Sequence, residues 1–252
     1  MALSLQYLLD APIIELDSID STNNYAMRLV DADTAQPGLT IVAREQTHGK
    51  GQRGRKWQDD AGQSLLMSIL VVPEYSLDRQ SLFNMRVAVA IADTVQNLYE
   101  GWDVRIKWPN DIIINDKKAG GVLIENVLRG SNWVYSIIGF GLNVQQENMP
   151  IDLPYSTSLK IECGKAFGVI DMCKQVRAEI FKNLLTRLPD DVALQKYNDH
   201  LYRIGQVQQF YDDDKEWKGV IDGVTMTGEL RVLLASGERV SYQHGAANWK
   251  WE

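Results

Sequence analysis

The sequence contains little cysteine and little histidine. Its two cysteines, Cys163 and Cys173, are too few for a disulfide framework in a chain of 28.5 kDa and are typical of reduced thiols. The three histidines are scattered, and together with the cysteines they give no zinc-binding spacing. The composition therefore argues against a disulfide-stabilised secreted scaffold, and we expect no metal held by the protein itself.

The sequence also has no hydrophobic run long enough to cross a bilayer. Its most apolar stretch, LLMSILVV at residues 65–72, is far shorter than the roughly 18–20 residues of a membrane span. The N-terminal stretch, MALSLQYLLDAPIIELD, has no basic region and no small-residue cleavage site, so it does not resemble a signal peptide. We expect a cytoplasmic protein with no membrane partner.

Positive charge is in deficit. The 26 Lys and Arg residues against 33 Asp and Glu residues give a net charge of −7, which argues against a surface devoted to nucleic acid or to an anionic membrane. We therefore expect no DNA binding, and a site for any anion must be a local concentration of positive charge. The hydrophobic content of 45% is that of an ordinary globular protein.

Hydrophobic periodicity predicts an α+β fold with a mixed, largely antiparallel sheet backed by helices. Apolar residues at helical spacing predict helices over about 22–33, 78–100 and 169–188, and again, weakly, up to 202. Aliphatic and β-branched segments bounded by turn residues predict strands over 39–44, 64–72, 104–108, 111–114, 118–128 and 133–144. Successive hairpins make the sheet largely antiparallel.

The pattern changes after Arg203. From Gly205 onward, short alternating segments are separated by turns that contain Gly and Asp, which is typical of a small β-barrel or sandwich. We therefore predict a larger domain over residues 1–203 and a small β-domain over residues 204–252.

One loop concentrates positive charge. Residues 44–56 read REQTHGKGQRGRK and hold five basic residues and three glycines. Glycine lets backbone N–H groups approach an anion, so phosphate binding is the functional interpretation, and a flexible solvated loop is the alternative. No helix opens after the glycines, and Gly49-Lys50 is not followed by Ser or Thr, which excludes a Rossmann fingerprint and a P-loop.

Two further segments combine charge with glycine. KWPND at residues 107–111 places a lysine, an aromatic ring, an amide and a carboxylate around a proline, and Lys117 and Lys118 precede Ala119-Gly120-Gly121. A lysine beside such glycines can meet a carboxylate or a phosphate. Taken alone, a lysine in a hairpin is usually solvated, and paired glycines usually mark a bulge in a strand.

In chain order, five motifs resemble those of the biotin protein ligases: DSTN at 20–23, Gln46 with GKGQRGRKW at 49–57, KWPND, KAGGVLIE at 118–125 and GFGLNV at 139–144. The resemblance runs from about residue 16 to the end. It implies a catalytic domain of the class II synthetase-like kind followed by an SH3-like β-barrel. Many relatives carry a DNA-binding segment before the ligase, and we expect a form without it.

The resemblance implies a reaction in two steps. Biotin and ATP, with Mg²⁺ as the counter-ion of the phosphates, give biotinyl-5′-AMP and pyrophosphate. A lysine of a biotin carboxyl carrier domain, in acetyl-CoA carboxylase or a related carboxylase, then takes the biotinyl group as an amide. Cationic groups and a water-poor site suit this chemistry, because charge grows on the phosphates and the mixed anhydride must be protected from water. We expect a monomer or a homodimer.

The resemblance also implies roles for individual residues. Catalytic roles are implied for Lys118, Asp111 and Lys50. The implied biotin-binding residues are Ser21, Thr22, Gln46, Gly49, Lys118, Gly121 and Gly139. The implied nucleotide- and phosphate-binding residues are Asn23, Lys50, Gln52, Arg53, Arg55, Trp57, Lys107, Asn110 and Asn143.

The phosphate loop departs from the family pattern, which is usually G-R-G-R-x-G-R. Here Lys50 and Gln52 stand in place of two arginines. Lysine keeps the charge but lacks the bidentate guanidinium, and glutamine loses the charge. We expect weaker retention of the adenylate.

Two other functions compete with this interpretation. Lipoate-protein ligases and octanoyltransferases share the fold by family resemblance, although a thiol-dependent transferase needs an activated cysteine, and neither Cys163 nor Cys173 has a sequence context that lowers a thiol pKa. A non-enzymatic nucleic-acid-binding protein could use the basic loop, but the net charge counts against it.

Overall fold

Two β-sheets organise the protein. The computed structural model describes residues 4–250 apart from 59, 187, 212–215 and 247. The strands of the larger, seven-stranded sheet run in the spatial order β1 (Ile13–Ile19), β2 (Thr40–Gln46), β3 (Ser64–Val71), β7 (Asn132–Asn143), β6 (Lys117–Arg129), β5 (Asp111–Ile114) and β4 (Val104–Lys107). The five-stranded sheet runs β11 (Arg239–Tyr242), β10 (Leu230–Leu234), β9 (Glu216–Val224), β8 (Val207–Tyr211) and β12 (Asn248–Trp249).

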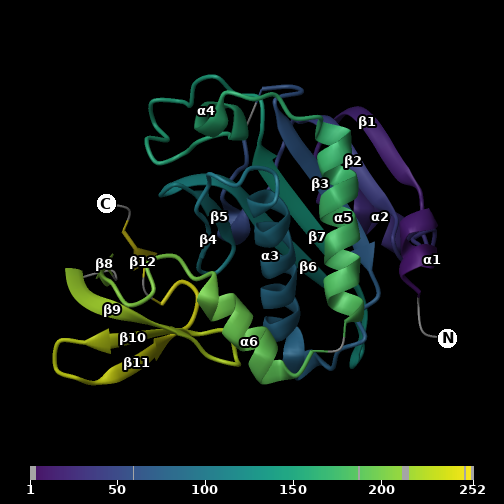
Figure 1. The fold of residues 1–252 in the computed structure, drawn as a ribbon. Coiled ribbons are helices and arrows are strands. Elements are labelled where there is room, and N and C mark those ends of the chain that lie inside the picture. Colours follow the sequence, from purple (N-terminus) through teal and green to yellow (C-terminus); the bar gives the residue numbers. More distant parts are fainter. Residues whose placement is uncertain (1–3, 59, 187, 212–215, 247, 251–252) are drawn as a thin grey trace.

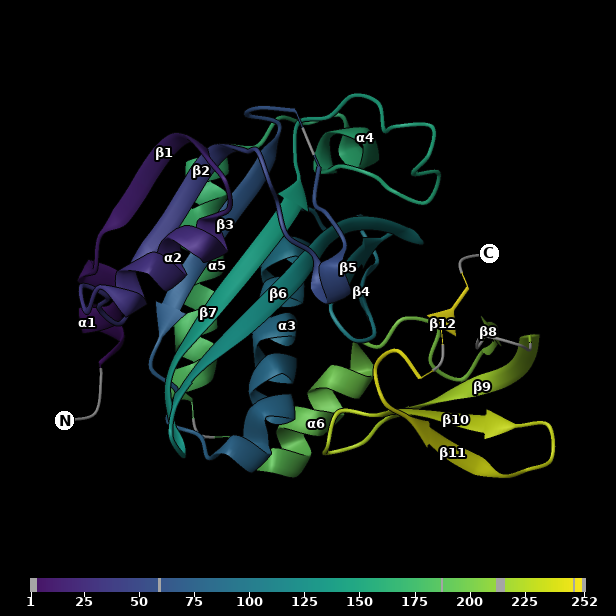
Figure 2. The same cartoon turned by 180° about the vertical axis from the view of Figure 1, so that it is seen from behind.

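The large sheet is antiparallel except at one edge. There β1 pairs in parallel with β2, and α2 (Thr22–Asp31) connects them. A parallel pair needs such a crossover, whereas the hairpins β4–β5, β5–β6 and β6–β7 need only turns. Figure 2 shows α2 lying over the face of β2 and β3 that is hidden in Figure 1. The predicted mixed, largely antiparallel sheet backed by helices is confirmed.

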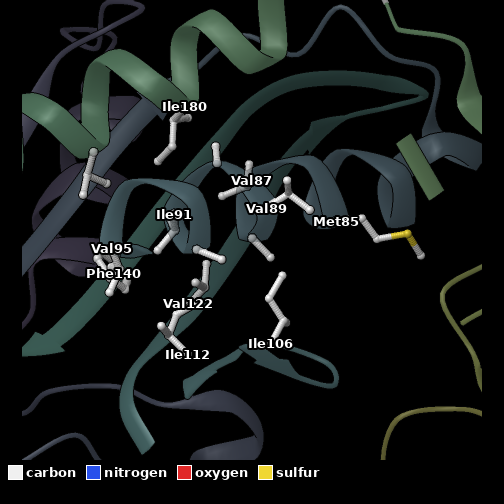
Figure 3. Close-up of a cluster of buried hydrophobic side chains, with 14 of the residues drawn as sticks. Met85, Val87, Val89, Ile91, Val95, Ile106, Ile112, Val122, Phe140 and Ile180 are labelled. Atoms are coloured by element: carbon white, nitrogen blue, oxygen red, sulfur yellow. The ribbon is translucent and has the colours of Figure 1, made fainter. Parts of the chain in front are cut away.

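The main core lies on the other face, under α3 (Gln80–Gln96) and α5 (Val169–Leu185). Helix α3 is buried on almost every side because the sheet, α5 and α6 (Asp190–Asp199) surround it. Figure 3 shows Val87 and Ile91 of this helix among Ile180, Phe140 and Val122. None of the helices in the described part of the chain is long and apolar enough to span a membrane.

Helix α6 connects the large sheet to the small one. It packs against α3 and touches β9 (Figure 1). The Asn198 side chain accepts a hydrogen bond from the Val224 amide at 2.7 Å, and His200 Nε2 lies 2.8 Å from Asp93 of α3. Hydrogen bonding to Asp93 raises the pKa of His200. These polar contacts hold α6 between α3 and β9, and so fix the small sheet beside the large one.

The predicted helices correspond to α2, α3, α5 and α6, and the predicted strands to β2–β7. The first turn predicted for the second helix is a 3₁₀ turn over Leu77–Arg79, and α3 begins at Gln80. The sequence prediction missed β1 and the short helices α1 (Leu5–Asp10) and α4 (Leu159–Cys163). Strands β8 to β12, which are the strands described after residue 205, lie in the small antiparallel sheet, and this is consistent with the expected SH3-like domain.

Replacing Ile91 by alanine tests the core under α3. The Ile91 side chain is fully buried, so Ile91→Ala should lower the free energy of unfolding by about 2–4 kcal/mol through lost burial and a residual cavity. Denaturant unfolding measures this directly. Ile151→Ala is the control, because Ile151 is 99% exposed and its loss should change stability by no more than about 0.5 kcal/mol. Equal effects of the two substitutions would contradict the described core.

Candidate active site

A pocket forms where strands of the large sheet carry glycine on the face covered by α2. In β7, Phe140 belongs to the core under α3, so Gly139 and Gly141 lie on the opposite face. The strand register pairs Gly141 with Gly121 of β6. Because these residues have no side chains, other groups can lie close to the sheet backbone here. The pocket is lined by Ser21, Thr22, Asn23, Gln46, Lys50, Trp57, Met67, Gly121, Leu123, Gly139, Phe140 and Gly141.

Buried polar side chains at the start of α2 form one side of this pocket. The Thr22 amide and hydroxyl both donate to Gln46 Oε1, at 2.8 and 3.1 Å. The Ser68 hydroxyl of β3 lies 2.7 Å from Thr22 Oγ1 and 2.6 Å from Asn23 Oδ1. This network joins α2, β2 and β3, and it presents donors and acceptors inside a pocket that Met67, Leu123 and Phe140 also line, as sites for small polar rings require.

Two side chains occupy the space above the β7 glycines. A methyl group at Gly139 would overlap Asn23 Oδ1, and one at Gly141 would lie 2.8 Å from the Trp57 ring. The indole nitrogen of Trp57 is buried without a hydrogen-bond partner among the described residues. Asn23 donates from Nδ2 to Glu125 Oε2 at 2.7 Å. Glycine at these positions is therefore a packing requirement of the site.

The basic loop closes on itself beside the pocket. The Gly51 amide donates to the Arg55 carbonyl at 2.7 Å, and the Trp57 amide donates to the Gly49 carbonyl at 3.0 Å. Lys50 Nζ lies 3.4 Å from Glu125 Oε1, so the loop also contacts β6. The loop is thus ordered by its own backbone and carries its charges at defined places.

A larger cleft of about 590 Å³ continues from the pocket and shares Lys50, Trp57, Gly121 and Leu123 with it. Its cationic lining residues are Lys50, Arg53, Arg55, Lys56, Lys107, Lys118 and Lys250. Asp111 is the one carboxylate among the described lining residues. Such an excess of cations in a protein of net charge −7 suits a polyanion.

Lys118 lies where the pocket and the cleft meet. Its ammonium is 2.7 Å from Asp111 Oδ1, and both residues line the cleft. The Gly121 position, which lines both cavities, is within 3.8 Å of Lys118 Nζ when a Cβ is built on it. The Lys118 amide donates to the Tyr155 carbonyl at 2.7 Å, which fixes the backbone. A carboxylate extending from the pocket and a phosphate in the cleft can therefore reach the same ammonium.

Lys107 is buried at the far side of the cleft, with 7% of its surface exposed. Burial lowers the pKa of Lys107 to about 8, an effect that Lys118 and Arg55 reinforce and Asp111 opposes. Burial and the neighbouring Arg53 and Arg55 also lower the pKa of His244, which lines the same cleft.

The structure brings most of the predicted site residues together. The pocket is lined by Ser21, Thr22, Gln46, Gly121 and Gly139, with Asn23 beside them, and Gly49 lines an adjoining hollow of the basic loop. The cleft is lined by Lys50, Gln52, Arg53, Arg55, Trp57, Lys107, Asn110, Asp111 and Lys118. Asn143 does not line either cavity, because its side chain is buried and donates to the Thr157 carbonyl at 2.9 Å. The individual roles stay predictions.

Sequence analysis missed several side chains of the site, among them Glu125, His244 and Trp249. Glu125 is two residues beyond Leu123 on the same face of β6, so strand alternation could have found it. His244 and Trp249 reach the cleft from the small sheet. No local sequence signal predicts their position, because it depends on how the two sheets pack.

Solved structures of biotin protein ligases have this fold. A biotin protein ligase from Aquifex aeolicus in complex with biotin and ATP matches with a TM-score of 0.79 and 24% identity, covering 95% of this chain and 99% of that one. A biotin acetyl coenzyme A carboxylase synthetase from Helicobacter pylori with bound biotinylated ATP matches with a TM-score of 0.65 and 19% identity, covering 92% and 100%. The chain therefore has the fold of these biotin protein ligases.

The chain belongs to the Biotin/lipoate A/B protein ligase family, whose model matches residues 15–143. It is 32% identical over 232 residues to the human biotin--protein ligase, covering 85% of this chain and 31% of that protein. It is 33% identical over 131 residues to the biotin--[acetyl-CoA-carboxylase] ligase of Paracoccus denitrificans, covering 50% and 51%. The chain spans less than half of the length of two further curated relatives that it matches, the bifunctional ligase/repressors of Bacillus subtilis and Bacillus spizizenii, at 47% and 41%.

Two glycine substitutions test the packing of the pocket. Gly139→Ala should lower the free energy of unfolding by about 1–3 kcal/mol, because the added methyl group overlaps Asn23 Oδ1. Gly121→Ala is the matched control on the neighbouring strand, where the methyl group would lie 3.5 Å from its nearest neighbour, an ordinary contact. Thermal unfolding compares the two. A Gly139→Ala protein as stable as Gly121→Ala would show that Asn23 does not lie over β7 as described.

Proposed function

We propose that this protein is an ATP-dependent biotin–protein ligase. It forms biotinyl-5′-AMP from biotin and ATP, and it transfers the biotinyl group to a lysine of a carboxylase carrier domain. The observation that carries this proposal is the Lys118–Asp111 ion pair, whose charged atoms are 2.7 Å apart. The pair lies where the pocket beside α2 meets the cationic cleft. Family membership and the names of the human and Paracoccus denitrificans relatives support biotin as the substrate.

In the first step, a biotin carboxylate oxygen forms a bond to the α-phosphorus of ATP. The bond from that phosphorus to the bridging oxygen breaks, and pyrophosphate leaves with the bonding electrons. The ring would bind against Thr22, Gln46 and Gly121, so that the carboxylate reaches Lys118. The cations of the cleft stabilise charge that grows on the phosphates, and Mg²⁺ enters as the counter-ion of ATP.

In the second step, the neutral amine of the carrier lysine attacks the acyl carbon. The bond from that carbon to the phosphate oxygen breaks, AMP leaves with the bonding electrons, and the nitrogen gives up one proton to water as the amide forms. Asp111 holds Lys118 in place and lies in the cleft where the amine must arrive. Trp57 lies over Gly141 beside the pocket, which restricts the approach of water to the mixed anhydride.

The proposal extends to the domains, location and partners of the protein. The proposed catalytic domain comprises residues 1–203, and residues 204–252 form the small C-terminal domain. The protein would act in the cytoplasm on a carrier domain, without binding DNA, as a monomer or a homodimer.

Lys118→Ala should abolish the first step while leaving the protein folded. Without the ammonium, neither the carboxylate nor the phosphate is held at the junction, and we expect biotin-dependent pyrophosphate release to fall by about 100-fold or more. Lys117→Ala is the matched control, because the neighbouring Lys117 side chain is 49% exposed and pairs with Glu162 instead. Near-normal pyrophosphate release by the Lys118→Ala protein would remove this residue from the site.

Gln52→Arg should make the enzyme retain its adenylate longer. The Gln52 side chain lines the cleft, and its carbonyl oxygen is buried without a partner among the described residues. A guanidinium there adds a charge and a bidentate donor, which should slow release of biotinyl-AMP by about tenfold. Biotinylation of a bystander protein measures the released adenylate. Gln36→Arg is the control, because it adds the same charge at an exposed residue before β2. Equal release of biotinyl-AMP by the two variants would contradict a role of position 52 in retaining the adenylate.

A further inference from the structure

The small sheet forms one side of the cationic cleft. His244, Gly245, Asn248, Trp249 and Lys250 all line it, and we call these five residues the C-terminal wall. They face the basic loop and the KWPND segment of the large sheet across the cleft. Residues far apart in the sequence are therefore joined at the site where the phosphates would bind.

The wall holds Arg53 of the basic loop. Arg53 Nη1 donates to the His244 carbonyl at 2.7 Å. A methyl group built on Gly245 would overlap the Arg53 guanidinium, so the guanidinium lies directly on the Gly245 backbone. Only a residue without a side chain leaves this space open. The contact fixes one end of the arginine and leaves its remaining donors at the cleft.

The wall also packs against Lys107. The Lys107 ammonium lies 4.8 Å from the centre of the Trp249 ring, a distance typical of a cation–π contact. Trp249 is itself held by its own sheet, since its indole nitrogen donates to Gln208 Oε1 at 3.1 Å and its ring packs against Phe210. The position of Lys107 thus depends on a residue of the small sheet.

Hydrogen bonds fix the small sheet, and with it the wall, against the large one. The Trp108 indole donates to the Gly228 carbonyl at 2.9 Å, and the Ser81 hydroxyl of α3 donates to the Thr227 carbonyl at 2.7 Å. The Trp108 ring also meets the His244 ring edge-on. The turn that contains Thr227 and Gly228 therefore anchors the small sheet next to Lys107.

We infer that the C-terminal wall positions Arg53 and Lys107 for the triphosphate of the nucleotide, with Gly245 and Trp249 as the positioning residues. The inference rests on the proposed function for the identity of the nucleotide as ATP. Without the wall, Arg53 would have no acceptor at His244 and Lys107 no aromatic neighbour at Trp249. Both cations would then have to be ordered when the phosphates bind, which weakens binding.

Gly245→Ala tests the Arg53 contact against a closely matched control. Gly245 and Gly237 both have positive φ, at 90° and 84°, but nothing lies within 4 Å of a methyl group at Gly237. Both variants share the backbone strain, and only Gly245→Ala displaces Arg53. We expect Gly245→Ala to weaken binding of inorganic tripolyphosphate, measured by calorimetry, about tenfold relative to Gly237→Ala, and to raise the KM for ATP more than it lowers kcat.

Trp249→Leu tests the Lys107 contact in the same assay. Trp217→Leu is its control, because Trp217 stacks on Phe210 in the same sheet but does not line the cleft. We expect tripolyphosphate binding to weaken about threefold or more in Trp249→Leu relative to Trp217→Leu.

Equal tripolyphosphate binding within both pairs, or no binding by the unaltered protein, would overturn the inference. If the unaltered protein released no pyrophosphate with biotin but the pairs still differed in tripolyphosphate binding, the proposed function would be contradicted and the inference supported.

Discussion

The ion pair between Lys118 and Asp111 connects the two halves of the site. It spans the β5–β6 hairpin, and the Lys118 backbone is bonded on its other side to the segment of Tyr155 and Thr157. Because the two side chains are partly exposed, at 34% and 18%, the pair contributes little to stability, but it holds one ammonium at a defined point. The glycines of β6 and β7, the basic loop and the cleft are all arranged around that point.

The distribution of charge explains how a protein with a net negative charge can have a cleft that suits a polyanion. Cations from the basic loop, from β4 and β6 and from the C-terminal end of the chain gather around one cleft. Their fields add there, while the net charge of −7 disfavours nonspecific binding of nucleic acid elsewhere. The polar residues at the start of α2 give the adjoining pocket the opposite character, because they offer hydrogen bonds to a neutral ring.

The sequence predicted the hairpin strands and the long helices because their apolar residues repeat with a clear period. It missed β1, an edge strand whose segment IIELDSI is only partly buried, and α1 and α4, which are too short for periodicity to develop. The motif residues were found by resemblance, and most of them converge on the two cavities. Asn143 turns to Thr157 instead, and Trp249 joins the cleft only through the packing of the small sheet. Neither outcome is encoded in local sequence.

Whether this protein activates biotin is tested by pyrophosphate release from ATP and Mg²⁺ by the purified protein, with biotin, lipoate and octanoate compared at equal concentration. The proposed function, which takes biotin from the names of the human and Paracoccus denitrificans relatives, predicts release with biotin and none above background with the other two acids. Release with lipoate or octanoate in preference to biotin would assign the protein to the lipoate branch of its family, and release with none of the three would contradict the adenylation chemistry.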